Sequence, residues 1–125
     1  MPRIDKVNEL IKREISQMLM LGEVRDPRVH FVTILSVDVS KDLQYARVRF
    51  STLSDDPADI KSTAEGLNSC RSYIRKLISQ RVEMRYTPQI HFIYDKSVQY
   101  AVKIDQALEE IKKLKKHPGD ADESN

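Results

Sequence analysis

The sequence contains few of the residues that most recognisable functional motifs require. Its 125 residues include one cysteine, three glycines and no tryptophan. A single cysteine excludes a disulfide framework and a cysteine-rich zinc site, and it is typical of a reducing compartment. The glycines are too far apart for a glycine-rich phosphate-binding loop. No apolar run has the length of a membrane span, and the first residues lack a signal-peptide core, so we expect a cytoplasmic protein.

Catalytic and metal-binding patterns are also missing from the sequence. His30, His91 and His117 have no second histidine, cysteine or carboxylate at metal-ligand spacing on the same predicted element. There is no nucleophile-elbow motif, and Cys70 is better explained as a small residue at a tight helix junction than as a nucleophile. A binding protein is therefore the expected class. A small enzyme with a site built from scattered residues is the weaker alternative.

The hydrophobic pattern predicts a single α+β domain over residues 1–116, followed by a disordered tail at 117–125. Apolar residues spaced by three and four predict helices, and stretches rich in β-branched and aromatic residues predict strands. Asp56 and Pro57 are suited to the cap and first position of a helix. The predicted order is helix 4–20, strand 29–39, strand 43–53, two helices between residues 57 and 82, strand 88–95 and helix 97–116.

The first two strands, 29–39 and 43–53, are predicted to form a hairpin with one buried and one exposed side. Ala46, Val48 and Phe50 alternate with polar residues and share one face. The first of these strands, at 29–39, is apolar on both faces in its early part, which favours a central position in the sheet. Three strands with helices on one face form an α+β sandwich.

The chain is organised around residues 60–85, where two helices are predicted to meet at a weak point. Ser69, Cys70 and Ser72 are poor helix formers, and Ser69 or Ser72 could cap the second helix. Residues 61–86 hold six basic and two acidic residues, a net charge of +4, although the whole chain carries only +2. This concentration favours phosphate binding. The basic residues at and beyond the break are Arg71, Arg75, Lys76, Arg81 and Arg85.

Two further surfaces are candidates for nucleic-acid binding. Arg25 and Arg28 flank Asp26 in the loop after the first helix, where they could contact phosphates or form a charge-balanced turn. The exposed side of the hairpin carries Tyr45, Arg47 and Arg49. Arginines on this side could contact phosphates, and the tyrosine could stack on bases. The alternative for each of these residues is a side chain that is only solvated or salt-bridged. A helix–break–helix unit beside a small sheet is the arrangement of a KH RNA-binding module without its GXXG loop.

A set of short segments, specific in its order and spacing, resembles a known family between Arg3 and Ile111. The segments are Arg25-Asp26-Pro27-Arg28, Val32-Thr33-Ile34, Val37-Asp38-Val39-Ser40-Lys41-Asp42-Leu43, Tyr45-Ala46-Arg47-Val48, Tyr73-Ile74-Arg75, Leu77, Arg85, Pro88 and Phe92-Ile93-Tyr94-Asp95. The family is that of the bacterial ribosome-binding factor A proteins.

The resemblance implies a type II KH-like fold in which a kinked helix pair replaces the GXXG loop. The family pattern at the kink is Ala-X-Gly, and this chain departs from it with Cys70, Arg71 and Ser72. The implied role is binding of the immature 30S subunit and its 16S rRNA to support late maturation of the 5′ region, especially in the cold.

The resemblance implies no cofactor and no catalytic residue. We expect a monomer that binds neither DNA, membrane nor a small-molecule substrate. The alternative function is a protein–protein adaptor on the ribosome that places the basic helix against an acidic partner. RNA affinity that falls steeply with salt would favour the first function, and binding to ribosomal proteins but not to rRNA would favour the second.

Overall fold

The computed structural model describes residues 3–116 and, within the last helix, the side chains of residues 97 and 104–113. The predicted tail at 117–125 lies outside the described residues. The chain divides into two compact units, Met1–Asp95 and Lys96–Asn125. Within residues 3–116 no helix combines the length and hydropathy that a membrane crossing requires. The elements follow the predicted order: α1 (Arg3–Met20), β1 (Val32–Val39), β2 (Tyr45–Thr52), α2 (Pro57–Ser69), α3 (Arg71–Arg81), β3 (Gln89–Tyr94) and α4 (Ser97–Lys116).

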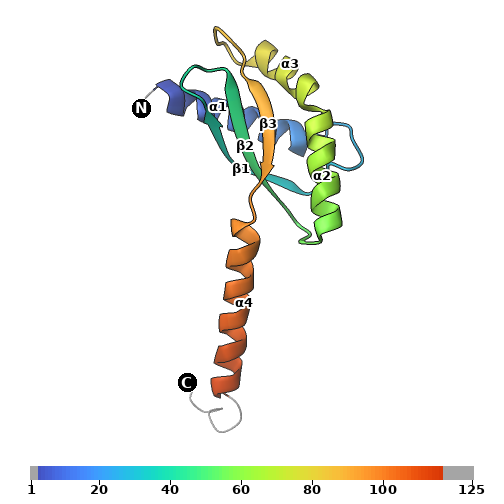
Figure 1. Cartoon of the computed structure of the whole chain (residues 1–125), viewed down its shortest axis with the longest axis vertical. Helices are drawn as coiled ribbons and strands as arrows, with labels where there is room; N and C mark the ends of the chain where they lie inside the picture. The colour runs from blue at the N-terminus through green and yellow to red at the C-terminus, as the bar shows by residue number, and fades with distance from the viewer. Residues whose placement is uncertain (1–2, 117–125) are drawn as a thin grey trace. The chain divides into compact units, whose positions relative to one another are not determined.

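The sheet of the first unit has the order β1-β2-β3, so β2 is its central strand (Figure 1). β1 runs antiparallel to β2, as the predicted hairpin requires, and β3 runs parallel to β2. The predicted central position of the first strand is wrong, because β1 lies at an edge. The register shifts between Ile34 and Ser36, which leaves Leu35 unpaired in a bulge. The bulge turns both Ile34 and Val37 toward the core. The early apolar residues at odd positions are Val29 and Phe31, which precede β1, and Leu35, which lies in the bulge.

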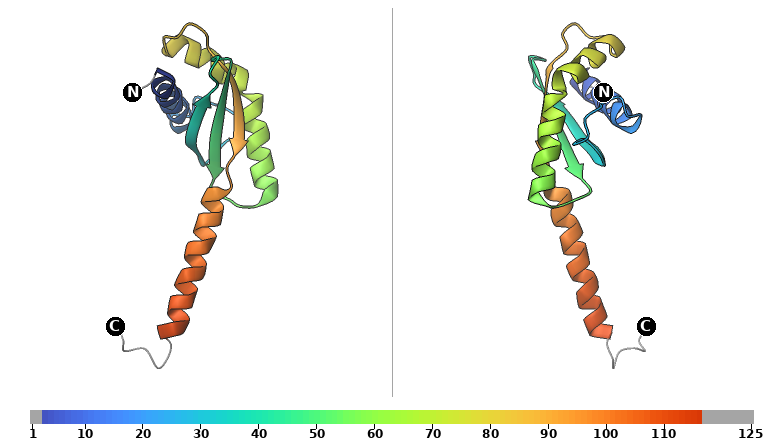
Figure 2. Two further views of the ribbon diagram at one scale, coloured as in Figure 1. Left: turned by 60° about the vertical axis from the view of Figure 1, so that its left-hand side comes forward. Right: turned by 90° about the vertical axis from the view of Figure 1, so that its right-hand side faces the viewer.

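The core lies between one face of the sheet and helices α1, α2 and α3. Ala46, Val48 and Phe50 of β2 are fully buried, as predicted. α1 packs along β1, whereas α2 and α3 both contact β3, and Figure 2 shows these helices with the sheet from two further directions. The helices contribute the buried side chains Ile11, Ile15, Met18, Leu67, Ile74, Leu77 and Ile78. The opposite face of the sheet carries Tyr45, Arg47 and Arg49 of β2 beside Gln89, His91 and Ile93 of β3.

Local signals place the ends of the helices and the hairpin turn. Asp56 caps α2, since its carboxylate Oδ1 accepts a hydrogen bond from the backbone N–H of Ala58 (2.9 Å), and Pro57 occupies the first helical position, as predicted. In the turn between β1 and β2, the Asp42 carboxylate accepts hydrogen bonds from the Ser40 hydroxyl (2.6 Å) and the Gln44 N–H (3.1 Å). These bonds hold Leu43 in the left-handed region (φ 61°) while its side chain packs partly against the core.

The second unit contains a single described helix, α4. Ile104, Leu108 and Ile111 follow helical spacing along it, and their side chains are exposed. The side chains of Val98, Ala101 and Leu114, which extend this spacing, lie outside the described set. Lys112 and Glu109 form a surface ion pair (3.8 Å).

Candidate nucleic-acid interface

The predicted interruption of the helix pair is confirmed and is one residue wide. α2 ends at Ser69 and α3 begins at Arg71, with Cys70 between them at φ −94° and ψ 1°. The Cys70 N–H still donates to the carbonyls of Gly66 (3.2 Å) and Leu67 (3.1 Å), while its own carbonyl accepts from the N–H of Ile74 (2.9 Å). The backbone N–H and carbonyl of Cys70 therefore both keep hydrogen bonds at the break.

The predicted serine cap of the second helix is wrong. The N-cap residue of α3 is Cys70, and no side chain forms a cap hydrogen bond there. The Ser69 hydroxyl instead accepts a hydrogen bond from Nη2 of Arg28 (3.2 Å). Cys70 packs against the core as a small, partly buried side chain. This burial raises the pKa of its thiol, which favours the protonated form.

The loop that carries Arg25 and Arg28 lies against α2, next to the kink. Gly66 permits this approach, since a Cβ there would lie 2.9 Å from both Cβ of Arg28 and Cγ2 of Val29. Asp26 accepts hydrogen bonds from the backbone N–H (2.9 Å), Nε (3.0 Å) and Nη2 (2.8 Å) of Arg28, which lower the pKa of its carboxyl to about 2. Arg28 is thus paired with Asp26, as the interpretation of this loop as a charge-balanced turn predicted. Its side chain also reaches Ser69 at the kink. Arg25 is exposed.

The polar side of α3 faces a cavity of ≈ 450 Å³. Arg75 donates from Nε (3.1 Å) and Nη2 (2.9 Å) to the carbonyl of Thr87, which ties the loop before β3 to the helix. Arg71 and Lys76 are exposed, and among the described residues neither has an acidic partner. The residues that line the cavity are Ser72, Arg75, Lys76, Ser79, Arg85, Tyr86 and Thr87.

Arg81 lies apart from this cavity and has an internal partner. Its Nη1 and Nη2 atoms donate to the two carboxylate oxygens of Glu23 (2.8 and 2.9 Å). This bidentate pair lowers the pKa of Glu23 and links the end of α3 to the turn after α1. An RNA phosphate at Arg81 would have to compete with that carboxylate, so we expect Arg81 to contribute less than Arg71, Arg75 and Lys76.

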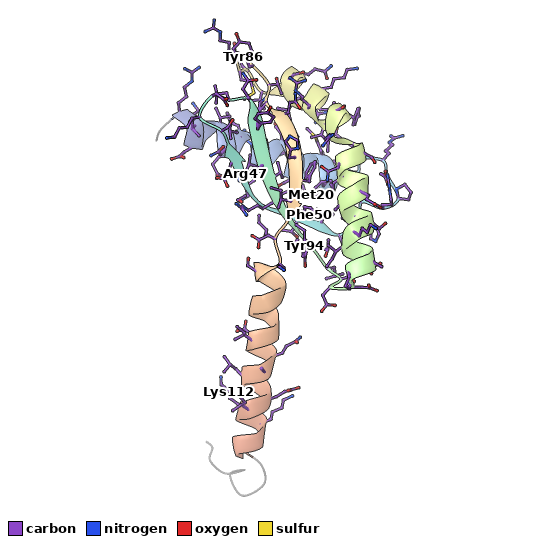
Figure 3. The ribbon with its side chains drawn as sticks, in the orientation of Figure 1. Met20, Arg47, Phe50, Tyr86, Tyr94 and Lys112 are labelled. Carbon is purple, nitrogen blue, oxygen red and sulfur yellow. The ribbon has the colours of Figure 1, made fainter. Side chains whose placement is uncertain are left out.

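The third predicted surface, the exposed side of the hairpin, lies on the open face of the sheet. Tyr45, Arg47 and Arg49 of β2 lie beside Gln89, His91 and Ile93 of β3 in parallel register. The rings of Tyr45 and His91 have centroids 5.8 Å apart with an interplanar angle of 39°. Arg49 lies 3.8 Å from the carboxylate of Asp38, and Figure 3 labels Arg47 on the same strand. His91 was not among the predicted site residues, although its alternation with Ile90 and Phe92 placed it on this face.

Sequence reasoning missed three residues at the end of the sheet where β2 and β3 begin. Tyr86 is 58% exposed beside Arg85, whose Cζ atom lies 5.6 Å from the centre of the tyrosine ring. Arg3 and Lys41 line a second cavity that also includes Tyr86. The sequence did offer a signal for Tyr86, because an aromatic residue directly follows Arg85 at the end of the basic segment 61–86. Within the described part of the chain, no group of three or more metal-ligating side chains is assembled.

Comparison with known proteins agrees with this arrangement. Residues 3–108 match the family described as Ribosome-binding factor A. The ribosome-binding factor A of Halothermothrix orenii is 43% identical over 110 residues, which cover 88% of this chain and 88% of that protein.

Solved structures with the same fold are also similar to this chain. A Thermotoga maritima protein, described as a candidate ribosome binding factor A, is 36% identical with a TM-score of 0.59, covering 72% of this chain and 88% of that one. A homology model of the Thermus thermophilus ribosome binding factor A, fitted into the cryo-EM map of a 30S complex, is 20% identical, with a TM-score of 0.58 over 71% of this chain and 91% of that one. The predicted α+β, KH-like fold is thereby confirmed.

Proposed function

Because this chain belongs to the ribosome-binding factor A family, we propose that it binds the immature 30S ribosomal subunit through its 16S rRNA. On the subunit it supports late maturation of the 16S rRNA 5′ region, chiefly in the cold, and it leaves when the subunit is mature. It acts in the cytoplasm as a monomer, without catalysis and without a cofactor. The Thermus thermophilus relative, which was fitted into a map of a 30S complex, supports the choice of particle.

The observation that carries the proposal is the continuity of two basic surfaces that the sequence presents separately. The hydrogen bond from Arg28 to Ser69 places the loop with Arg25 and Arg28 at the kink. From there Arg71, Arg75 and Lys76 continue along the exposed side of α3. A phosphate backbone that follows this line would meet cations from both segments. The carboxylates near Arg28 are Asp26, which is already paired with it, and Glu65.

The surface is suited to the RNA backbone more than to individual bases. Lysine and arginine contacts to phosphates supply affinity that depends on salt and little on sequence. Folded RNA is recognised mainly by shape and by its unpaired nucleotides. An rRNA region whose structure changes during maturation offers both features, which accounts for release from the mature particle.

Chemical footprinting tests the proposal directly. Immature and mature 30S particles are probed with and without the protein, at two salt concentrations. We expect a compact set of 16S rRNA nucleotides to be protected in the immature particle, and the protection to weaken with salt and to be absent from the mature one. Binding that protects no rRNA, and that persists on ribosomal proteins stripped of RNA, would instead establish the adaptor function.

A further inference from the structure

The parallel pairing of β2 with β3 brings two loops to one end of the sheet. Since parallel strands begin at the same edge, the hairpin turn before β2 and the loop before β3 are neighbours. The N–H of Gln89 donates to the carbonyl of Gln44 (2.9 Å), which joins the two segments directly. The N-terminal turn of α1 closes the same corner, where Ile4 and Val7 lie beside Leu43.

Tyr86 is placed between two cavities at this corner. The first is the cavity of ≈ 450 Å³ on the polar side of α3, with Arg75 and Lys76. The second has a volume of ≈ 370 Å³ and is lined by residues of α1, the hairpin turn and the loop before β3, with Arg3 and Lys41 as its further cations. Arg85 and Tyr86 line both cavities. Figure 3 shows Tyr86 on the loop between α3 and β3.

The charges around the ring are almost all positive. Asp42 is the acidic residue that lines the second cavity, and its carboxylate already accepts hydrogen bonds from Ser40 and Gln44. The guanidinium of Arg85 lies over the ring of Tyr86, which leaves the ring available for stacking on its other face. An aromatic ring with cations on two sides matches a nucleotide whose base stacks while the phosphates before and after it extend in opposite directions.

We propose that Tyr86 is a stacking platform for an unpaired RNA nucleotide. One flanking phosphate lies in the cavity with Arg75 and Lys76, and the other lies in the cavity with Arg3 and Lys41. The proposal rests on the proposed function and specifies the form of the RNA, because a base within a duplex cannot reach the ring. The site therefore selects single-stranded RNA over a duplex of the same sequence.

The proposal is tested with a short single-stranded RNA that carries the fluorescent base 2-aminopurine, and with the same strand annealed to its complement. The wild-type protein is expected to quench the base in the single strand and to bind the duplex more weakly. Tyr86→Leu keeps an apolar side chain but removes the ring, so it should abolish quenching and reduce affinity for the single strand about 5- to 150-fold. Tyr86→Phe retains the ring and should behave as the wild type.

Tyr73→Leu is the matched control, because Tyr73 is a similarly exposed tyrosine (49%) on α3 that lines neither cavity. It should leave quenching and affinity unchanged. Wild-type quenching and affinity in Tyr86→Leu would overturn the platform, and so would equal losses in Tyr86→Leu and Tyr73→Leu. If the wild-type protein bound immature 30S particles but not the single strand, the platform would be wrong and the proposed function would stand. Failure to bind the particles would instead overturn the proposed function.

Discussion

Adjacent residues of β2 have opposite surroundings, and this difference can be tested one residue at a time. Val48 is fully buried against the helices, whereas Arg49 lies on the open face near Asp38. Val48→Asp should unfold the domain, because burial of an unpaired charge costs several kcal/mol, a large part of the roughly 5–15 kcal/mol that stabilises a typical domain. Arg49→Ala should change the free energy of unfolding by no more than about 0.5 kcal/mol, since exposed ion pairs contribute little.

Urea denaturation followed by circular dichroism measures both effects. Equal midpoints for Val48→Asp and the parent would show that the faces of the strand are reversed. Val48→Ala leaves a small cavity but buries no charge, so its midpoint should fall between them.

The carboxyl of Asp26 makes stability depend on pH in a defined window. Its pKa is about 2 in the folded protein, below the ordinary value of 3.8, mainly because Arg28 donates hydrogen bonds to it. Since the folded state favours the deprotonated form, this contribution is complete above about pH 4 and is lost as the pH falls toward 2. Asp26→Asn should therefore lower the melting temperature at pH 6, and its melting temperature should fall less than that of the parent between pH 4 and pH 2.

Thermal unfolding at pH 6, 4, 3 and 2 provides the comparison. Glu23 and Asp42 also have lowered pKa values, so the variant should retain part of the acid sensitivity. Parallel curves for the parent and Asp26→Asn would rule out a stabilising role for this carboxylate.

At the scale of elements, the approach of the loop at residues 25–29 to α2 depends on Gly66. A methyl group there would meet Cβ of Arg28 and Cγ2 of Val29, each at 2.9 Å, so the loop or the helix must shift. Alanine improves helix propensity by about 1 kcal/mol, whereas overpacking costs typically about 1–3 kcal/mol. We expect the clash to dominate, and Gly66→Ala to lower the free energy of unfolding by about 1 kcal/mol.

The same substitution should also weaken RNA binding, because it displaces Arg28 from Ser69 and separates the loop from the kink. Lys61→Arg, which keeps the positive charge at an exposed position of the same helix, is the control for a general effect of substitution in α2. Denaturation and affinity for immature 30S particles are measured on both variants. A Gly66→Ala protein more stable than the parent would mean that the loop adjusts freely.

At the scale of the whole molecule, the position of charge matters more than its total. The net charge of the chain is only +2, yet residues 61–86 carry six basic and two acidic residues. Replacement of Arg71, Arg75 and Lys76 together by alanine should weaken binding to immature 30S particles. The salt slope should fall by about 0.7–0.9 for each phosphate that the variant no longer neutralises. Folding should survive, since the three side chains are exposed and lie off the buried stripe of Ile74, Leu77 and Ile78.

A control triple variant distinguishes the effect of losing cations at this site from the effect of lowering the net charge of the chain. Lys6→Ala, Arg13→Ala and Lys113→Ala remove three exposed cations from α1 and α4, outside residues 61–86. Affinity is measured at several salt concentrations, with circular dichroism to verify folding. If the first variant bound with parental affinity and an unchanged slope, the RNA site would lie elsewhere, and we would then place it at Arg25, Arg28 and the face with Arg47 and Arg49.

The sequence by itself determined the order of the elements, a break within residues 69–72, the cap at Asp56 and the two faces of β2. Each of these depends on residues within one or two turns of one another, or on simple alternation, so local spacing carries the information. The concentration of positive charge around α3 was visible for the same reason. The RNA-binding roles of its residues stay predictions that the variants above address.

Only the tertiary structure decided the edge position of β1, the parallel pairing of β3 and the partners of the arginines. Arg28 meets Ser69 across 41 residues, and Arg81 meets Glu23 across 58, so one cation lies at the kink and the other is held in an internal ion pair. Tyr86 gains its two basic cavities because strand pairing brings the hairpin turn and the start of α1 beside its loop. No local pattern encodes these contacts, since each depends on packing between segments far apart in the chain.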